Sequence, residues 1–344
     1  MRLRKIFFIL IFFLFIMPFS LVLMPSASAD TDEEAATVPV GEKMVTSQAA
    51  IVMDHHTGLV IFEYNADDMR VPASMVKMFA VYVILDTIRD GHISYEAFIQ
   101  TSAQVSAFSF NREYSNVPMP VNSFFTVRSL LDAVIVRSAC AATVALGEGI
   151  FGSEEVLVYK MNEKAEQLGI EAEFFDSWGG SPENRLSARG MADLTRSLIN
   201  EHPAVLGFTS QSSIFFDEIE YRNTNPLLID YEGVDGFKTG YTNAAGWCFT
   251  GTAKINGRRL ISVTMGSVQG YRFPDTVILL DHGFASFDRV MADHFRNASK
   301  PNGFDQKANS PLVPIVLYNV KEVKHFDLIY LAMILNEFNA FTRS

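Results

Sequence analysis

Ser74 and Lys77 are the first pair of side chains in this sequence that could carry out chemistry together. They lie three residues apart at the start of an apolar segment, and residues at this spacing share one face of a helix. A serine hydroxyl is a weak nucleophile unless a base within hydrogen-bond reach accepts its proton. A lysine amine can be that base when it is neutral, a state favoured by burial or by a second nearby cation. The pair therefore predicts a nucleophilic serine activated by a lysine.

A second group that could carry chemistry is Lys238-Thr239-Gly240, which follows a short apolar run. On a strand, Lys238 and Gly240 face one side and Thr239 the other, although an edge strand can present all three to a groove. Because Gly240 has no side chain, a substrate chain could lie close to its backbone. Lys238 is also a candidate for the second cation beside Lys77. Each group taken alone has an ordinary structural alternative. Lys77 could be a solvent-facing lysine on a helix, and Lys238-Thr239-Gly240 could be the end of a strand followed by a turn.

The apolar pattern predicts the elements that position these residues. Strands are predicted where short apolar runs are bounded by turn residues, at 49–53, 59–62, 236–239, 247–253 and 260–265. Helices are predicted where the apolar segments are longer, at 74–90, 125–149, 186–199 and 276–287. The order of strands, then helices, then strands predicts an α+β fold, in which helices pack on a mixed sheet.

The two ends of the chain differ from the part between them. Residues 1–29 combine three basic residues, an apolar run and a small-residue site, which predicts a cleavable secretory signal, with an uncleaved membrane anchor as the alternative. Residues 30–295 are the predicted catalytic domain. Residues 296–344 are predicted to be a linker and tail without a complete second domain, and the linker covers 297–314. The apolar stretch at 328–335 is too short to span a membrane, so it would dock on the core or touch a membrane surface.

Composition excludes several classes of protein. A chain of 344 residues with 49% hydrophobic residues is not disordered as a whole. The net charge of −11, without any run of Lys and Arg, argues against a nucleic-acid partner. Cys140 and Cys248 are too few for a disulfide framework and are predicted to be free thiols. His55 and His56 lie among turn residues and predict a solvated loop in preference to a metal site.

S-x-x-K followed by K-T-G is a signature of penicillin-binding proteins and class A β-lactamases. The chain resembles the D-alanyl-D-alanine carboxypeptidase family of low-molecular-mass penicillin-binding proteins, from about residue 49 to residue 287. The segments that carry the resemblance are 72–77, 126–131, 137–142, 223–225, 227–228, 233–242 and 245–248. The family implies a transpeptidase-like fold, with an antiparallel sheet between helical layers, and no metal or organic cofactor. It also implies an exported enzyme, on the periplasmic or envelope side of the inner membrane, that trims peptidoglycan stem peptides and is inhibited by β-lactams.

The resemblance implies roles for individual residues. Ser74 would be the acylated nucleophile and Lys77 its base, while Ser138 would help to pass a proton to the departing D-alanine. Lys238 would keep the site electropositive, and the Thr239 hydroxyl would meet the terminal carboxylate of the substrate.

The remaining implied roles concern the substrate groove. The backbone N–H groups of Ser74 and Tyr241 would form an oxyanion hole, whose donors stabilise charge that develops in the transition state. Gly240 and Tyr241 would line the groove. Arg272 resembles the family arginine near the carboxylate pocket.

One position departs from the family pattern. The family has an asparagine as the third residue of its S-x-N motif, whereas this chain has Cys140. Sulfur is a weak donor and acceptor, so it does not replace both functions of a carboxamide. Losing such a polar contact costs on the order of 1–3 kcal/mol, which predicts a slower enzyme.

Three alternatives to a carboxypeptidase remain open at this level. The same pocket could cut D-alanyl cross-links as an endopeptidase. Cys140 could mark a catalytically weakened protein that still binds peptidoglycan. A β-lactamase is disfavoured because the nearest acidic candidate, Glu183 beside Asn184, lacks the spacing of that class.

Overall fold

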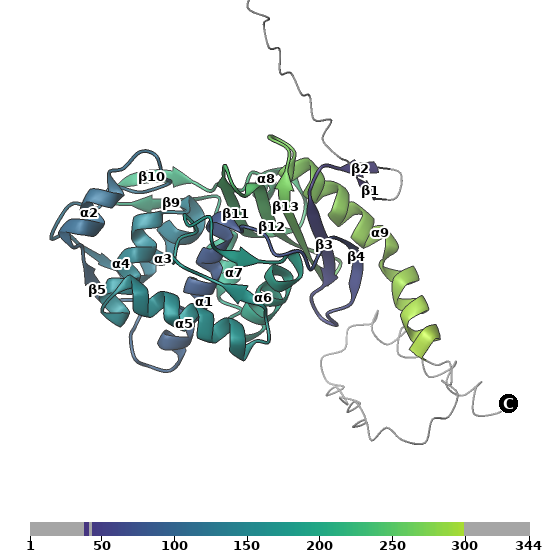
Figure 1. Ribbon diagram of the computed structural model, residues 1–344, viewed down its shortest axis with the longest axis horizontal. Coiled ribbons are helices and arrows are strands. Elements are labelled where there is room, and N and C mark those ends of the chain that lie inside the picture. Colours follow the sequence, from purple (N-terminus) through teal and green to yellow (C-terminus); the bar gives the residue numbers. More distant parts are fainter. Residues whose placement is uncertain (1–37, 41–42, 299–344) are drawn as a thin grey trace, which may run out of the picture. The chain divides into compact units, whose positions relative to one another are not determined.

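The computed structural model describes residues 38–40 and 43–298 (Figure 1). Residues up to Met291 form one compact unit, and the described part of the second unit, from Ala292, is the end of a helix. The predicted signal at 1–29, the tail from residue 299 and the apolar stretch at 328–335 lie outside the described residues. Within the described residues, no helix has both the length and the hydropathy needed to cross a membrane.

The fold is built on a five-stranded antiparallel sheet with the order β11-β12-β13-β3-β4 (Figure 1). Its strands are β3 (Ala49–Asp54), β4 (Val60–Tyr64), β11 (Val234–Thr242), β12 (Gly246–Ile255) and β13 (Arg258–Ser267). β3 and β4 confirm the strands predicted at 49–53 and 59–62 and pair with each other, and the other three strands confirm the later predictions. β11, which carries Lys238, Thr239 and Gly240, lies at one edge of the sheet.

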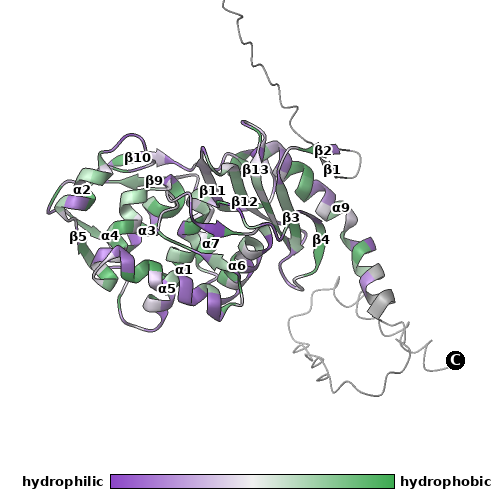
Figure 2. Cartoon of the chain, viewed as in Figure 1, coloured by the Kyte–Doolittle hydropathy of each residue, from purple (hydrophilic) through white to green (hydrophobic). Residues whose placement is uncertain are grey.

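Alternation along the central strands gives the sheet two apolar faces. Ile51 and Met53 of β3 pack into a large core with the helical part of the chain, whereas Ala50 and Val52 pack into a smaller core that contains Leu280. Successive residues of a strand point to opposite faces, so one apolar strand can serve both cores. Figure 2 shows β3 and β4 as largely hydrophobic strands. The site lies at the sheet edge farthest from β4.

Nine α-helices lie in the described residues. Their bounds are α1 (Lys77–Arg89), α2 (Ala103–Ser109), α3 (Val127–Asp132), α4 (Cys140–Phe151), α5 (Glu154–Gln167), α6 (Ala188–Glu201), α7 (Val205–Thr209), α8 (Leu227–Asp230) and α9 (Arg272–Ala298). α1 is buried from Lys77 to Leu85 and is contacted by α5 and α6. α6 packs on β3 and β13 on the face of the large core.

Three predicted helices are confirmed, and four of the described α-helices, α2, α5, α7 and α8, lie outside every predicted helix. The predictions at 74–90, 186–199 and 276–287 correspond to α1, α6 and part of α9. α9 continues to Ala298, so the predicted domain boundary at 295–296 and the start of the predicted linker at 297 fall inside a helix. α5 was not predicted. Its signal is a capping serine before a buried stripe at Leu157, Met161 and Ala165, one residue per turn.

Four short two-stranded sheets lie outside the main sheet, in the helical part of the chain and at the N-terminal end of the described residues. They are formed by β1 (Val38–Val40) with β2 (Lys43–Val45), β5 (Phe98–Gln100) with β6 (Phe124–Thr126), β7 (Ala172–Glu173) with β8 (Arg185–Leu186), and β9 (Ser213–Phe216) with β10 (Ile219–Arg222). Strands of two to four residues leave little alternation to detect, and none of these was predicted.

The predicted helix at 125–149 is wrong in its continuity. α3 ends at Asp132, a π-helical turn follows at Ala133–Arg137, and Ser138 has a left-handed backbone with φ of 63° before α4 begins. The amide of Cys140 donates to the Ser115 carbonyl at 2.9 Å instead of to an earlier turn of a helix. This hydrogen bond to a residue distant in the sequence outweighs the helical preference of an apolar, Ala-rich segment. The break places Ser138 at a cleft that Ser74 also lines.

Candidate active site

Ser74 and Lys77 lie at the junction between a short 3-10 helix, Ala73–Val76, and α1. The Lys77 Nζ atom is 2.9 Å from the Ser74 Oγ atom. Lys77 is fully buried, whereas Ser74 is half-buried and faces the cleft. Ala73 adopts a left-handed backbone with φ of 49° just before the serine. The structure therefore brings hydroxyl and amine into contact, as the three-residue spacing predicted, although Ser74 lies in a 3-10 turn.

The surroundings of Lys77 leave its nitrogen oriented toward the serine. Lys77 Nζ donates to the Trp178 carbonyl at 2.6 Å and contacts the Cys140 sulfur at 3.4 Å. A neutral amine has two N–H donors and one lone pair. With two acceptors occupied by the N–H groups, the lone pair is free to accept the proton of Ser74. This is the geometry that a general base requires.

Ser138 and Lys238 form a second hydroxyl–amine pair. Lys238 Nζ lies 2.8 Å from Ser138 Oγ and 3.0 Å from the Thr239 carbonyl. Lys238 is 1% exposed, and burial lowers its pKa well below the usual value, with a further lowering whenever Lys77 is protonated. A lysine in this state can give up a proton more readily than one in water.

These two pairs lie at a cleft of about 430 Å³ between the edge strand β11 and the helical part of the chain. Seven of the nine predicted site residues line it: Ser74, Ser138, Cys140, Thr239, Gly240, Tyr241 and Arg272. The other two, Lys77 and Lys238, are buried and contact Ser74 and Ser138, which line the cleft. All nine are thus gathered at one site.

The sheet wall of the cleft is positively charged. Arg272 Nη1 donates to the Gly240 carbonyl at 3.2 Å, and its guanidinium stacks on the Trp247 ring at 4.7 Å. Burial lowers the pKa of Arg272 to about 10, which still leaves it charged at neutral pH. The Thr239 hydroxyl lies 2.8 Å from that of Thr224. The Thr239 hydroxyl and the Arg272 guanidinium line the same cleft, and a hydroxyl together with a guanidinium suits a carboxylate.

The helical wall contains residues that sequence reasoning missed. Trp178, whose carbonyl accepts from Lys77, stacks edge-on against Tyr114 at 5.0 Å. Asp176 holds this loop by accepting from the backbone N–H groups of Trp178, Gly179 and Ser181. Such an acceptor ahead of a Gly-Gly pair is the sequence signal of a turn and would have predicted the loop.

A close approach of two backbones fixes the loop against the nucleophile. Gly179 has a φ of +87°, and a Cβ atom there would lie 2.0 Å from the Ala73 carbonyl oxygen. On the other side, a Cβ atom at Gly240 would lie 2.9 Å from the Pro72 carbonyl oxygen. The serine turn is therefore held between two glycines, which explains its unusual backbone.

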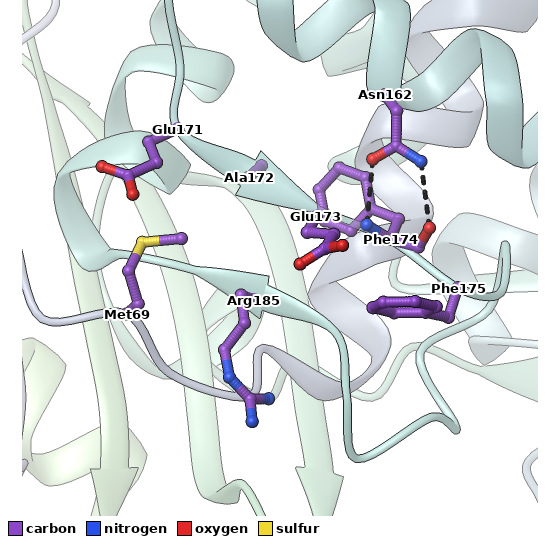
Figure 3. Close-up of a pocket in the computed structure, with 8 residues that line it drawn as sticks. All are labelled: Met69, Asn162, Glu171, Ala172, Glu173, Phe174, Phe175 and Arg185. Atoms are coloured by element: carbon purple, nitrogen blue, oxygen red, sulfur yellow. Dashed lines mark hydrogen bonds between the residues drawn. The ribbon is translucent and has the colours of Figure 1, made fainter.

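A larger cleft, of about 780 Å³, lies elsewhere in the described chain (Figure 3). It is lined by Met69, Asn162, Glu171, Ala172, Glu173, Phe174, Phe175 and Arg185. Asn162 is used structurally, because its amide exchanges hydrogen bonds with the backbone of Phe174. Figure 3 shows carboxylates and one guanidinium around this cleft, without a hydroxyl nucleophile. The larger of these two clefts therefore does not contain the residues predicted to carry out catalysis.

The two cysteines are free, as predicted, and both are buried. Burial raises the pKa of Cys248 to about 11. His55 and His56 lie in the turn between β3 and β4. Among the described residues, the one group of carboxylates and histidine with metal-ligand spacing is Asp86, Glu201 and His202.

Ion pairs already satisfy that group. Lys164 lies 2.6 Å from Asp86, and Arg89 contacts both Asp86 and Glu201. Because the side chains of Lys164 and Arg89 already neutralise the two carboxylates, a metal ion is disfavoured at this position. We interpret the cluster as a structural network of ion pairs.

The family model for D-alanyl-D-alanine carboxypeptidase matches residues 33–269. The chain belongs to this family. Two curated relatives are D-alanyl-D-alanine carboxypeptidase DacF of Bacillus subtilis (strain 168), 30% identical over 78% of this chain and 69% of that protein, and DacA of Haemophilus influenzae, 33% identical over 76% and 67%. A D-alanyl-D-alanine endopeptidase of Escherichia coli K12 is 28% identical over 74% of this chain and 83% of that protein.

Solved structures agree with the family. Penicillin binding protein 5 from Haemophilus influenzae is 31% identical over 73% of each chain, with a TM-score of 0.69. Penicillin-binding protein D2 from Listeria monocytogenes, solved in an ampicillin-bound form, is 28% identical over 70% of this chain and 98% of that one, with a TM-score of 0.61. These matches confirm the predicted family, the α+β transpeptidase-like fold and the enzyme class, a serine-type D-alanyl-D-alanine carboxypeptidase.

Proposed function

We propose that this carboxypeptidase releases the terminal D-alanine of peptidoglycan stem peptides through an ester formed on Ser74. The observation that carries the proposal is the 2.9 Å contact between the Ser74 hydroxyl and the buried amine of Lys77 at the substrate cleft. A nucleophile in contact with a base that is itself oriented by a third group is the arrangement that acyl transfer requires.

The charge distribution sets the direction of the substrate. The terminal carboxylate binds the Thr239 hydroxyl and the guanidinium of Arg272 on the sheet wall, which the buried Lys238 makes more positive. The peptide then lies along the open edge of β11, with Gly240 giving it room against the backbone. The scissile carbonyl thereby faces Ser74.

Acylation moves one proton and one acyl group. Ser74 Oγ forms a bond to the carbonyl carbon while its proton passes to neutral Lys77. The backbone N–H groups of Ser74 and Tyr241 bind the developing oxyanion. As the C–N bond breaks, Ser138 gives its proton to the leaving nitrogen and takes one from Lys238, 2.8 Å away. The total charge of the two lysines stays constant.

Hydrolysis reverses these transfers. A water molecule attacks the ester and its proton returns to Lys238 through Ser138. Lys77 returns a proton to Ser74 Oγ as the shortened peptide leaves. The low pKa of buried Lys238 supports a lysine that both gives and accepts a proton in one cycle.

The test is intact-mass analysis of the purified protein with a penicillin, followed by D-alanine release from a diacetylated Lys-D-Ala-D-Ala peptide. We expect a mass gain of one penicillin that is absent in Ser74→Ala, together with release of D-alanine. If neither occurs, the chain is a peptidoglycan-binding protein silenced at Cys140.

An endopeptidase that cuts D-alanyl cross-links is the second candidate. It is favoured by the share of the related endopeptidase that the chain spans, 83%, against 69% and 67% for the two carboxypeptidases. A cross-linked stem-peptide dimer separates the two activities. Faster cleavage of the dimer than of a free D-Ala-D-Ala end would favour the endopeptidase.

We also propose that the enzyme works outside the cytoplasm, where its peptidoglycan substrate lies. The basic and apolar pattern of residues 1–29 supports export through a cleaved signal. N-terminal sequencing of the mature protein should begin at Asp30. Contact of the tail from residue 296 with a membrane surface remains part of this proposal, and release of the protein from membranes by deleting that tail would support it.

A further inference from the structure

We infer that Glu113 selects the substrate by binding a side-chain ammonium on the residue that precedes D-Ala-D-Ala. This inference rests on the proposed function and adds a specificity-determining residue to it. Glu113 lines the same cleft as Ser74 and lies in the segment between α2 and β6.

The charges around the cleft make Glu113 distinctive. Arg272 is in the lining, and the Lys77–Lys238 pair, which carries one positive charge in the proposed mechanism, lies beneath it, so the floor and the sheet wall are cationic. Glu113 is the one acidic residue among those that line the cleft in the described chain; the others apart from Arg272 are neutral. The cleft is therefore bipolar, with a site for an anion at one wall and a site for a cation at the other.

The position of Glu113 is fixed by its neighbours and not by an ion pair. Its backbone N–H donates to Asn111 Oδ1 at 2.9 Å. Tyr114, the next residue, packs on Trp178, and Ser115 Oγ donates to the Arg137 carbonyl at 2.6 Å. Within the described residues, the Glu113 carboxylate makes no hydrogen bond or ion pair, and the residue is exposed. An anchored segment thus presents an unused carboxylate to the cleft.

The polarity of the substrate matches that of the cleft. Its terminal carboxylate is bound on the sheet wall by Thr239 and Arg272, so the peptide must leave the nucleophile toward the helical wall, where Glu113 lies. A long side chain that ends in an ammonium, on the residue before D-Ala-D-Ala, could reach this carboxylate and donate charge-assisted hydrogen bonds. A neutral side chain at that position would leave Glu113 unpaired.

The experiment compares two peptides that differ in one charge. They are Nα-acetyl-Lys-D-Ala-D-Ala with a free ε-ammonium and the same peptide acetylated at Nε, and the readout is kcat/KM for D-alanine release. We expect the wild-type protein to prefer the charged peptide about two- to fivefold, which is the range that one solvent-exposed ion pair gives. Glu113→Gln should abolish the preference, and Glu113→Lys should reverse it, while both variants keep the wild-type rate on the acetylated peptide to within about twofold.

A matched control separates a local contact from general attraction. The chain carries a net charge of −11, so a cationic peptide is favoured at long range whatever Glu113 does. Glu220→Gln removes an exposed carboxylate from β10, outside the cleft, and should keep the preference. Equal rates on the two peptides in the wild type, or a preference that survives Glu113→Gln, would overturn the inference. Release from neither peptide, without a penicillin adduct, would instead overturn the proposed function on which it rests.

Discussion

The sulfur of Cys140 lies 3.4 Å from the Lys77 nitrogen, on the same amine that contacts the Ser74 hydroxyl. Family resemblance implies an asparagine at this position. A carboxamide oxygen would accept from Lys77 more strongly than sulfur, and its NH₂ group would remain for the substrate. The base therefore keeps its orientation here mainly through the Trp178 carbonyl, at 2.6 Å.

Cys140→Asn should raise activity. The carboxamide restores a polar contact worth about 1 kcal/mol or more, so we expect kcat/KM for D-alanine release to rise at least about fivefold. Active-site titration with a penicillin gives the fraction of folded sites in both proteins. A lower rate at equal site count would mean that the cleft is built around the thiol and would contradict this prediction.

Ser138→Ala should slow departure of D-alanine. The hydroxyl is the proton path between Lys238 and the leaving nitrogen, and positioned proton transfer is worth about 100-fold or more. Ser138→Gly is the matched variant, because it also lacks the hydroxyl but adopts the left-handed backbone without strain. Similar losses of kcat/KM in both variants would assign the effect to the hydroxyl, whereas a loss confined to Ser138→Ala would assign it to the backbone.

Asp176→Asn should disturb catalysis without removing any group that touches the substrate. The amide has one acceptor oxygen, so the loop that carries the Trp178 carbonyl loses part of its support. We expect kcat/KM to fall about tenfold. Asp217→Asn, in the turn between β9 and β10, should leave kcat/KM unchanged. A lower melting temperature of Asp176→Asn with an unchanged kcat/KM would leave Asp176 a purely structural role.

Gly179→Ala should be far more damaging than Gly152→Ala. The φ angles of Gly179 and Gly152 are +87° and +88°, so both variants incur the same backbone strain, on the order of 1 kcal/mol. A Cβ atom at Gly179 would also overlap the Ala73 carbonyl, whereas nothing lies within 4 Å of one at Gly152. Urea unfolding should give a difference between the two variants of at least about 2 kcal/mol, and penicillin acylation should be lost only in Gly179→Ala. Equal stability of the two would show that the loop can move away from Ser74.

Asp86→Asn should lower stability at neutral pH but not in acid. Burial raises the pKa of Asp86, but hydrogen bonds from His202 and Lys164 lower it by more, so the folded-state pKa lies below its usual value. Such a carboxylate contributes stability above its unfolded-state pKa of about 3.9, and this stability is lost as the pH falls through the folded-state pKa. We expect a loss of about 2 kcal/mol at pH 7 that shrinks below about pH 4.

The control for this prediction is Asp90→Asn. Asp90 is exposed and pairs with Arg89 at 3.0 Å, an arrangement that contributes little. Urea unfolding of both variants between pH 3 and pH 7 should show a pH-dependent difference only for Asp86→Asn. A constant difference across that range would mean that the Asp86 network does not titrate with folding.

The local pattern of apolar and turn residues was sufficient to predict the strands of the main sheet and two of its helices. The five strands of the sheet have apolar runs bounded by turns, and α1 and α6 have long apolar segments, so their residues signal them without tertiary help. The continuous helix at 125–149 was predicted for the same reason and was wrong. Its break at Ser138 depends on acceptors such as the Ser115 carbonyl, which no local pattern reveals.

The sequence by itself determined the chemistry that is possible: a hydroxyl and an amine one helical turn apart, and a Lys-Thr-Gly segment on a strand that could lie at an edge. Only the tertiary structure decided which groups meet. The Lys77 contact with the Trp178 carbonyl and the Lys238 contact with Ser138 join residues 101 and 100 positions apart. Hydrogen bonds act over about 3 Å, so residues this far apart in the chain meet only once the sheet and the helices have packed.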